Sequence, residues 1–546
     1  MSGPVTGPVS GSHDADVVIV GAGIGGLTAA AYLQATGRRC VVVDRHAVVG
    51  GNVSTFTHHG FEFDVGTHYV GGCGPGGLVA SILGGLGLDE RVRWRELDPD
   101  GFDRFCFPDA TYSMPRGLER WRDRLAGWFP AEREGIDAYC SFVAGVAEAV
   151  AAVTDGGPME KLALLLEHRD TTLGSLFDGL GLSPRLRAVL GAQHLVYGVG
   201  PARVSAVVHA LVAGHYLDGA FYPEGGGQAL SDALAGFVRD RGGEILLRTP
   251  VERILVEGGR AVGVALRPAS PHRRRGVPDE VRAPVVVSNA DLKRTVSELV
   301  GEEHLPADWV GRIRGLRMGP PLFVAYLVLD RDLAAEGHPN ANAHVLAGDD
   351  VDAEYDALAR GDLVDEPTLF LSFASLKDPT NARLGGPGRT NLQVMALVPP
   401  DPAFWGLERG PAAGERYRRN PAYRERKHEL ARRVVRLAGR AVPGLEESVA
   451  YLETATPITH ERFVRSTGGT SYGFELTPDQ SLDRRPGPVT PLPGLFLAGA
   501  GTLTAHGIAA CMASGLAAAE AVTGEPLART VRAGGRVAEP ARTPGP

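Results

Sequence analysis

The chain has 546 residues, of which 44% are hydrophobic and 22% charged, and this composition is typical of a globular protein. Its length exceeds the usual size of one domain, so two connected domains are expected. The formal net charge of -8 at pH 7 and the isoelectric point near 6.1, without a sustained basic stripe, argue against nucleic acid as a partner. The densest basic run, HRRR at residues 272–275, is interpreted as a solvated hairpin tip.

The N-terminal residues, two uncharged windows and the cysteines bear on the location of the protein in the cell. The N-terminal residues 1–13 have neither a basic start nor an apolar core, which predicts a disordered tail rather than a signal peptide. Two long uncharged windows, 65–88 and 494–519, are broken by glycines and are not expected to cross a membrane. A reduced, cytoplasmic protein is predicted from five scattered cysteines without CxxC spacing: Cys40, Cys73, Cys106, Cys140 and Cys511.

A strand, a glycine turn and a helix open the chain. Residues 16–20 are one aspartate followed by four β-branched residues, and this uncharged run is typical of a buried parallel strand. Gly21, Gly23 and Gly26 then fill the GxGxxG spacing, and good helix formers follow at residues 27–35. These glycines permit a tight turn, close approach of the backbone to a pyrophosphate, and packing of helix on strand. The stretch therefore predicts a dinucleotide-binding unit.

The residues that follow favour a flavin over a nicotinamide dinucleotide. A second strand at residues 40–43 ends in Asp44, close to the spacing of about 20 residues expected for a carboxylate that binds ribose. Its presence argues against a 2′-phosphate at Arg45. A glycine pair at residues 50–51 and a hairpin at 61–65 come next, where a plain nicotinamide dehydrogenase would continue with βαβ units. A flavin dinucleotide, with its ribityl chain, needs such additional backbone contacts.

Several segments together resemble the carotenoid desaturase, carotenoid isomerase and retinol saturase family of flavoproteins. The segments are GAGIGGLTAAAYL, VVVD, GGNVSTF and FDVGTHYVGG, and the last is most similar to retinol saturases. FASLKDPT at residues 373–380 also resembles retinol saturases, whereas GAGT at 499–502 is closer to carotenoid desaturases. The likeness therefore covers nearly the whole chain.

The expected fold class is α/β, with a doubly wound, Rossmann-type (GR2-like) FAD-binding domain, a mixed α/β substrate domain and a helical insertion. The helical insertion is expected where apolar residues recur at three- and four-residue steps. The predicted division of the chain is: FAD-binding segments 14–117, 221–290 and 486–524; helical insertion 118–220; substrate domain 291–485; disordered tails 1–13 and 525–546.

The resemblance implies FAD as the cofactor and places the Val251 backbone beside the adenine. No cluster of His, Cys and carboxylate side chains at ligand spacing stands out, so no metal is expected. The residues expected to bind FAD are Gly21, Gly23, Gly25, Gly26, Asp44, Arg45, Gly50, Gly51, Asn52, Gly66, Thr67, Val251, Asn289, Gly499, Ala500, Gly507 and Ile508.

Four side chains are candidates for donating a proton or positioning a substrate: His68, Tyr69, Glu224 and His506. The resemblance places the first two beside the isoalloxazine and the last near the flavin, where they could equally serve structure or cofactor contact. Glu224 stands where the family usually carries a basic residue. In an apolar cavity its pKa would rise and it could donate a proton, whereas its plainer interpretation is a loop-anchoring carboxylate.

Only the resemblance supplies a substrate class. It implies saturation or desaturation of a carbon–carbon double bond in a retinoid, carotenoid or other polyene, by hydride transfer through the flavin N5. A redox-neutral double-bond isomerase using reduced FAD is the nearest alternative. Amine or porphyrinogen oxidation, and a carrier that holds FAD and apolar ligands without turnover, are further alternatives. An apolar substrate also suggests transient peripheral membrane contact, and the oligomeric state stays open.

Overall fold

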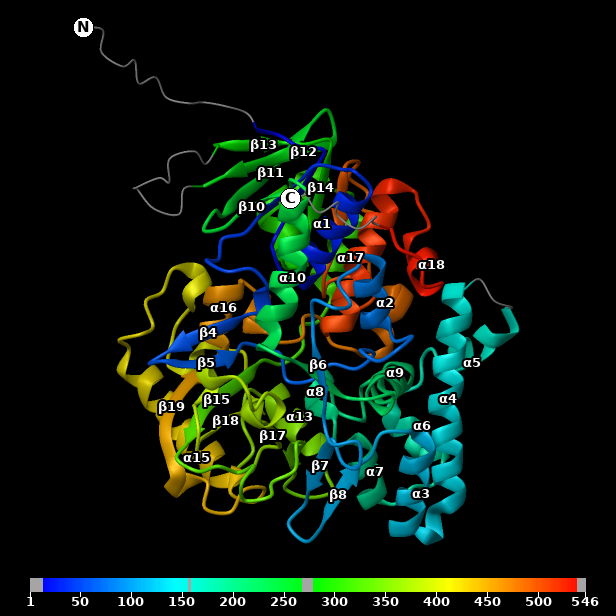
Figure 1. Ribbon diagram of the computed structural model, residues 1–546, viewed down its shortest axis with the longest axis vertical. Coiled ribbons are helices and arrows are strands. Elements are labelled where there is room, and N and C mark those ends of the chain that lie inside the picture. Colours follow the sequence, from blue (N-terminus) through cyan, green and yellow to red (C-terminus); the bar gives the residue numbers. More distant parts are fainter. Residues whose placement is uncertain (1–12, 156–158, 268–277, 538–546) are drawn as a thin grey trace, which may run out of the picture.

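The computed structural model describes residues 13–155, 159–267 and 278–537, so the HRRR run lies outside the described residues. Figure 1 shows a parallel sheet with its helices in the upper half, a larger sheet at the lower left and a group of helices at the lower right. The predicted fold class, a Rossmann-type FAD-binding domain with a mixed substrate domain, is confirmed.

Three distant parts of the chain build the parallel sheet. Its order is β10-β3-β2-β14-β20, and every neighbouring pair is parallel. The segments predicted to form the FAD-binding domain thus meet in one sheet. Its strands are β2 (Val17–Val20), β3 (Cys40–Val43), β10 (Glu244–Leu246), β14 (Val285–Ser288) and β20 (Leu495–Leu497).

Both faces of this sheet are buried, which explains its uninterrupted apolar strands. On β2, Val17 and Ile19 pack into a core made with helices, whereas Val18 and Val20 pack toward a second sheet. The covering helices are α1 (Ile24–Ala35), α2 (Leu78–Gly85), α10 (Gly226–Asp240) and α17 (Ile508–Thr523). The second sheet has the order β1 (His13–Asp14), β13 (Glu280–Arg282), β12 (Arg260–Leu266), β11 (Val251–Glu257).

The substrate domain is a seven-stranded mixed sheet. Alternate residues of its central strand β15 face opposite sides: Phe323 and Ala325 pack under helix α15 (Pro421–Ala438), while Val324 and Tyr326 face the other core. In order, the strands are β19 (Val449–Ala455), β15 (Leu322–Leu329), β18 (Thr390–Leu397), β17 (Leu369–Ser372), β16 (Asn342–Val345), β7 (Asp103–Cys106) and β8 (Thr111–Met114).

Two of these strands correct the predicted domain boundary. β7 and β8 were expected in the first FAD-binding segment, but β7 pairs in parallel with β16 of the substrate domain. The buried carboxylate of Asp103 accepts a hydrogen bond from Asn342 Nδ2 at 3.2 Å across that pair. A four-residue strand carries no local signal for which sheet it joins, so only the tertiary structure reveals this.

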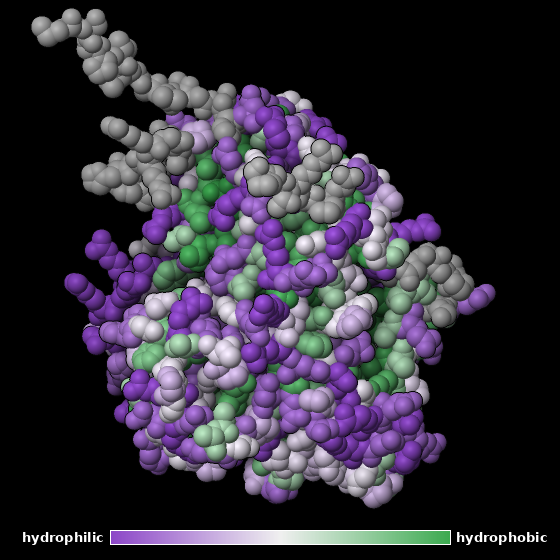
Figure 2. Space-filling model, in the orientation of Figure 1, coloured by the Kyte–Doolittle hydropathy of each residue, from purple (hydrophilic) through white to green (hydrophobic). Residues whose placement is uncertain are grey.

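The helical insertion lies within the predicted residues 118–220. Its helices are α3 (Leu118–Trp128), α4 (Arg133–Asp155), α5 (Ala163–Glu167), α6 (Leu173–Gly179), α7 (Pro184–Gly191), α8 (His194–Tyr197) and α9 (Ala206–Leu217). By length and composition, the helical stretch Pro130–Ala152 is the one helix among the described residues apolar enough to cross a membrane, and 44% of its apolar window is buried. Figure 2 shows hydrophobic residues where α4 meets α9 and a hydrophilic surface around α3.

Shorter elements connect these parts. The hairpin β4 (Thr55–His58) and β5 (Phe61–Asp64) forms where a hairpin was predicted, and β6 (Trp94–Glu96) pairs with β9 (Phe221–Pro223). The remaining α-helices are α11 (Leu292–Arg294), α12 (Ala307–Gly315), α13 (Asp352–Ala359), α14 (Ala374–Lys377), α16 (Pro457–Val464) and α18 (Leu527–Arg532).

Helix α18 corrects the prediction of disorder from residue 525. Leu527 and Val531, one turn apart, are each 2% exposed and pack into the core shared with α2 and α17. The backbone N–H of Val537 donates to the Gly85 carbonyl at 2.9 Å. Two apolar residues in an Arg-, Pro- and Gly-rich stretch were too weak a pattern to predict this docking; residues 538–546 lie outside the described residues.

Candidate active site

A cavity of about 1420 Å³ lies between the parallel sheet and the seven-stranded sheet. It is lined by residues from the glycine turn after β2, the β4–β5 hairpin, the start of β11, the end of β14 and the turn before α17. Sites for a single small ligand usually occupy roughly 300–1,000 Å³. The cavity therefore has room for a dinucleotide together with a second ligand.

The glycine turn has the geometry that a pyrophosphate requires. Gly21 has a φ of +99°, and a Cβ on Gly26 would lie 2.1 Å from the Gly21 carbonyl oxygen, so glycine is needed at both positions. Gly23 is the N-cap of α1 and no side chain caps that helix. The first N–H groups of α1 are thus available at the cavity wall, where they favour an anion.

Asp44 is held at the edge of the cavity by the backbone. Its carboxylate accepts hydrogen bonds from the N–H of Ala22 at 2.7 Å and of His46 at 2.6 Å. These bonds fix the carboxylate against the glycine turn, where it can accept from a ribose hydroxyl. The neighbouring Arg45 also lines the cavity, and its Nη1 donates to the Arg462 carbonyl at 3.1 Å.

Asn289, at the end of β14, joins the three FAD-binding segments. A Cβ on Gly23, Gly25 or Gly499 would lie 2.4–2.8 Å from the amide atoms of Asn289. Only glycine therefore lets this amide sit between the first and last segments. Gly507, with a φ of +100°, is the N-cap of α17 and has no side-chain cap, so a second helix N-terminus faces the cavity.

The structure brings nearly all of the predicted cofactor residues to the cavity. Gly26 and Thr67 do not line it. Gly26 instead packs against the Gly21 carbonyl, and Thr67 supports the turn at Gly227, where a Cβ would meet Thr67 Oγ1 at 2.1 Å. The lining residues are Gly21, Gly23, Gly25, Asp44, Arg45, Gly50, Gly51, Asn52, Gly66, Val251, Asn289, Gly499, Ala500, Gly507 and Ile508.

The family comparison supports the same interpretation. The family model for flavin containing amine oxidoreductases matches residues 24–523. The chain belongs to this family of flavoenzymes. Its cofactor is FAD, as predicted from the motifs, and the three segments described above line the cavity in which we expect it to bind.

Among its relatives, the chain is similar to all-trans-retinol 13,14-reductase of Macaca fascicularis, with 29% identity over 89% of this chain and 82% of the relative. It is also 23% identical to the chloroplastic prolycopene isomerase of Daucus carota, over 94% and 81% of the two chains. A solved structure of putrescine oxidase superposes with a TM-score of 0.61 at 17% identity, covering 94% of this chain and all of that one. The predicted resemblance is confirmed by these relatives.

His68 and Tyr69 both line the cavity, and their predicted position beside the isoalloxazine stays a prediction. His68 lines the cavity and its Nδ1 is buried without a hydrogen-bond partner. Burial, and secondarily the charge of Lys377, lowers the pKa of His68 to about 3, so the ring is neutral near pH 7. Its ring meets Phe370 edge-on at a centroid distance of 5.5 Å.

Tyr69 is bound to a buried carboxylate. Its hydroxyl donates to Asp103 Oδ2 at 3.0 Å, and its ring stacks on Tyr216 at a centroid distance of 4.1 Å. Burial raises the pKa of Tyr69 well above its usual value, and the Asp103 charge raises it further. Tyr216 also lines the cavity, and burial raises its pKa as well. Both hydroxyls therefore keep their protons at neutral pH.

His506 lies in the turn before α17 and also lines the cavity. Burial, with the nearby Arg485 charge, lowers the pKa of His506 to about 4. Its Nδ1 has no side-chain or backbone partner, and its ring lies 5.3 Å from that of Tyr472. The two cavity histidines that were candidate acids are thus both neutral at pH 7.

Glu224, the candidate acid if it lay in an apolar cavity, does not line the cavity. Its carboxylate pairs with Arg95 Nε at 2.8 Å, and its side chain is 30% exposed. Its backbone N–H donates to the Arg93 carbonyl at 2.9 Å. The arginine that neutralises it comes from β6, which pairs with β9, a contact that the sequence does not reveal. Glu224 therefore anchors a loop, which was its plainer interpretation.

Lys377 is a buried charged residue that supports the site, and the sequence reasoning missed it. It is fully buried, and its Nζ donates to the His68 carbonyl and to Ser372 Oγ, both at 2.7 Å. Burial lowers the pKa of Lys377 to about 7, although the charges of Asp103 and Asp64 oppose this. Lysine is rarely buried without a purpose, and this one holds the turn that carries His68. A charged residue inside the FASLKDPT segment was the available signal.

The wall opposite the cofactor residues is apolar. It is formed by the inner face of the seven-stranded sheet and by the helical insertion, and buried aromatic and aliphatic side chains cover it. One charged residue lies beside this set: Glu453, the partner of Tyr326 across β19 and β15, also lines the cavity and is ion-paired with Lys427 at 3.0 Å. The other residues of this wall are apolar and suit a long hydrocarbon. The residues are Leu195, Val196, Leu322, Val324, Tyr326, Phe370 and Met395.

Proposed function

We propose that this flavoenzyme acts on a carbon–carbon double bond of a long apolar polyene, by saturation, desaturation or isomerisation. The observation that carries the proposal is the apolar wall, which faces the FAD-binding segments across one cavity of about 1420 Å³. Two relatives named for retinol reduction and prolycopene isomerisation support a polyene over an amine. The putrescine oxidase likeness supports the fold alone.

Saturation adds one hydride and one proton to the double bond, and bound FAD supplies or accepts the hydride. The chain must hold the proton. Tyr69 is a poor source, because its ionisation would place a phenolate against the Asp103 carboxylate. Tyr216, stacked on Tyr69 and lining the cavity, is the better source, because Asp103 is hydrogen-bonded to Tyr69 and opposes ionisation of Tyr216 only through its charge. The stacked Tyr69 ring then positions Tyr216.

Isomerisation is the second candidate. The neutral state of His68 and His506 favours it, because a redox-neutral reaction needs no net proton donor. In that case the aromatic and aliphatic wall has only to bind the polyene and exclude water while the double bond changes geometry or position.

The test is anaerobic reaction of the FAD holoenzyme, in its oxidised form and after chemical reduction, with all-trans-retinol, a carotenoid, an unsaturated fatty acid and an amine, followed by mass and chromatographic analysis. A polyene product that gains or loses two hydrogen atoms supports saturation or desaturation. A product of unchanged mass but altered geometry supports isomerisation. Peroxide release with the amine alone, in air, contradicts the proposal, and so does a flavin that no polyene changes.

The location of the protein stays a prediction. All five cysteines are free, which agrees with a reducing compartment. A cytoplasmic protein with transient membrane contact would have access to an apolar substrate, and cell fractionation of the tagged full chain tests this directly.

A further inference from the structure

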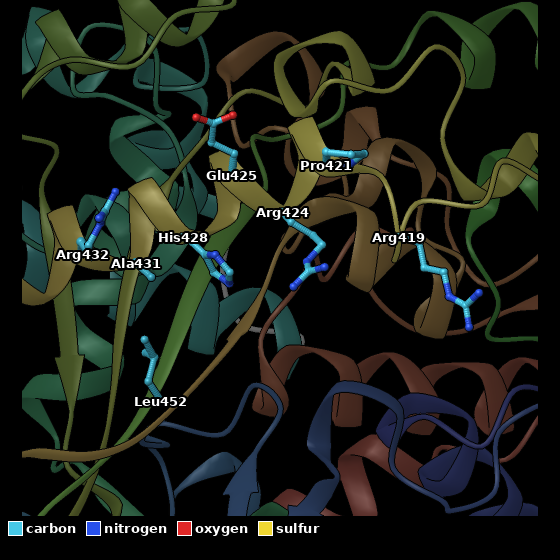
Figure 3. Close-up of a pocket in the computed structure, with 8 residues that line it drawn as sticks. All are labelled: Arg419, Pro421, Arg424, Glu425, His428, Ala431, Arg432 and Leu452. Atoms are coloured by element: carbon cyan, nitrogen blue, oxygen red, sulfur yellow. The ribbon is translucent and has the colours of Figure 1, made fainter.

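A basic recess of about 650 Å³ opens on the outer side of the substrate domain (Figure 3). It is bounded by the first half of α15, by the loop before this helix and by β19. Arg424 and His428 lie one turn apart on the same face of α15. The residues that line it are Arg419, Pro421, Arg424, Glu425, His428, Ala431, Arg432 and Leu452.

The arginines of this recess are not neutralised by the described part of the chain. Neighbouring cations do have partners: Arg426 pairs with Glu429 at 2.9 Å, and Lys427 pairs with Glu453 at 3.0 Å. No ion pair is recorded within the described residues for the three arginines that line the recess. The single acidic residue that lines the recess is Glu425, and in Figure 3 its carboxylate points away from Arg424 and His428, on the side to which Arg432 also points. The recess is therefore cationic although the whole chain carries a charge of -8.

The recess adjoins the flavin cavity. Arg424 and His428 line both spaces, and Tyr417 and Tyr423, from the core under α15, also line the flavin cavity. Leu452 of β19, a large apolar residue that is 41% exposed, lies at the recess. Charge at the outer end and apolar surface within suit a ligand that is itself amphipathic.

We infer that the recess binds the anionic head group, a carboxylate or phosphate, of an amphipathic polyene whose chain extends into the flavin cavity. Guanidinium groups suit this role because they bind carboxylate and phosphate oxygens in a bidentate manner. The inference rests on the proposed function and narrows its substrate class from apolar polyenes to polyenes with an acidic end.

The test compares all-trans-retinoic acid with all-trans-retinol, which share a polyene and differ in the head group. Equilibrium binding to the FAD holoenzyme is measured by quenching of protein fluorescence, at low and at high salt. The wild type is expected to bind the acid about tenfold more tightly at low salt, as a charge-assisted hydrogen bond allows. Because the recess is open to solvent, high salt should reduce this preference.

The variants Arg424→Gln and Arg419→Gln are expected to lose the preference for the acid and keep the affinity for retinol. Arg436→Gln is the matched control, because Arg436 is an exposed arginine on α15 outside the recess. Flavin absorption and thermal unfolding of each variant establish that it is folded and loaded with FAD.

Equal binding of acid and alcohol by the wild type overturns the inference, as does a preference that survives in both recess variants. Either result leaves the proposed function standing if retinol is still converted. Conversely, a retained preference without any turnover contradicts the proposed function alone. Vesicles of phosphatidylserine test the remaining alternative, a membrane surface. If the wild type binds these vesicles and Arg424→Gln does not, while the soluble acid and alcohol bind equally, the recess binds a membrane surface and the inference is wrong.

Discussion

The two sides of the flavin cavity are built in different ways. On the cofactor side, the wall is backbone: glycine turns, two uncapped helix N-termini and one carboxylate held by backbone N–H groups. On the substrate side, the wall is side chains from the inner face of one sheet and from the helical insertion. A backbone wall constrains the sequence at each position, whereas a side-chain wall needs only apolar residues of suitable volume.

This difference explains why the cofactor is readable from motifs and the substrate is not. Gly23, Gly25, Gly26 and Gly499 cannot be replaced without a clash, and Gly21 and Gly507 have a positive φ that favours glycine, so their spacing is a signal in the sequence. Many different sequences could form the apolar side with the same chemical character. Gly26→Val and Tyr216→Phe disrupt one side each, whereas Lys377→Met and Glu224→Gln change residues that do not line the cavity.

The largest effect is expected from Gly26→Val on the cofactor side. The new Cβ would lie 2.1 Å from the Gly21 carbonyl oxygen, so the turn must move and FAD binding should be lost. The flavin absorption of the purified protein, per polypeptide, measures this. Gly84→Ala is the matched control, because no atom lies within 4 Å of its Cβ position in α2, and it should retain full flavin content. A flavin-replete Gly26→Val protein would contradict the assigned role of the turn.

Tyr216→Phe is expected to affect the substrate side alone. If Tyr216 supplies the proton, the rate of saturation should fall roughly 10²- to 10⁴-fold, the usual contribution of a general acid, while flavin content stays unchanged. Single-turnover kinetics with reduced holoenzyme measure the loss. Tyr139→Phe is a suitable control, since Tyr139 is a buried tyrosine that does not line the cavity and hydrogen-bonds His209. A large loss in Tyr69→Phe with none in Tyr216→Phe would reverse the assignment.

Lys377→Met tests the support behind the substrate side through pH. The folded-state pKa of about 7 lies below the ordinary value of 10.5, so between these values the unfolded chain binds more protons than the native protein. Stability contributed by this group must therefore rise with pH across that window, by about 1.4 kcal/mol per pH unit for one proton. When urea unfolding is measured at several pH values above 7, the free energy of unfolding of the wild type should increase relative to that of Lys377→Met by this amount per pH unit. A difference that does not vary with pH would contradict a buried, titrating lysine.

The smallest effect is expected from Glu224→Gln. Its ion pair with Arg95 is partly exposed, and such pairs contribute about 0–1 kcal/mol. Turnover should stay within about a factor of two of the wild type. A loss of turnover comparable to that of Tyr216→Phe would show that Glu224 takes part in the reaction and would contradict its placement outside the cavity.

Local pattern was sufficient for the cofactor side of the fold. The predicted strand at 40–43 is observed as Cys40–Val43, and the three predicted FAD-binding segments meet in one sheet. Each of these elements has a continuous apolar strand, a glycine turn or a helix pattern of its own. Neither uncharged window forms a single helix: 65–88 contains a loop before α2, and 494–519 contains β20, a turn and most of α17.

Non-local contacts account for what the sequence left unpredicted. Asp103 belongs to the substrate sheet because β7 finds a partner in a strand more than 200 residues away. Glu224 is removed from the cavity by Arg95, and Lys377 approaches His68 only through the packing of α14 on β18. The basic recess could not be predicted from the sequence, because unpaired arginines are recognised only once their neighbours are placed.

The central claim is that FAD on the backbone side of the cavity reacts with a polyene bound on the apolar side. The most direct test is the visible spectrum of anaerobically reduced holoenzyme after mixing with all-trans-retinol. We predict that the flavin reoxidises as a product with two additional hydrogen atoms appears, or stays reduced while the retinol changes geometry at constant mass. A flavin that stays reduced with every polyene, and that stays oxidised when the same polyenes are mixed with oxidised holoenzyme, with no polyene altered in either case, would contradict the account.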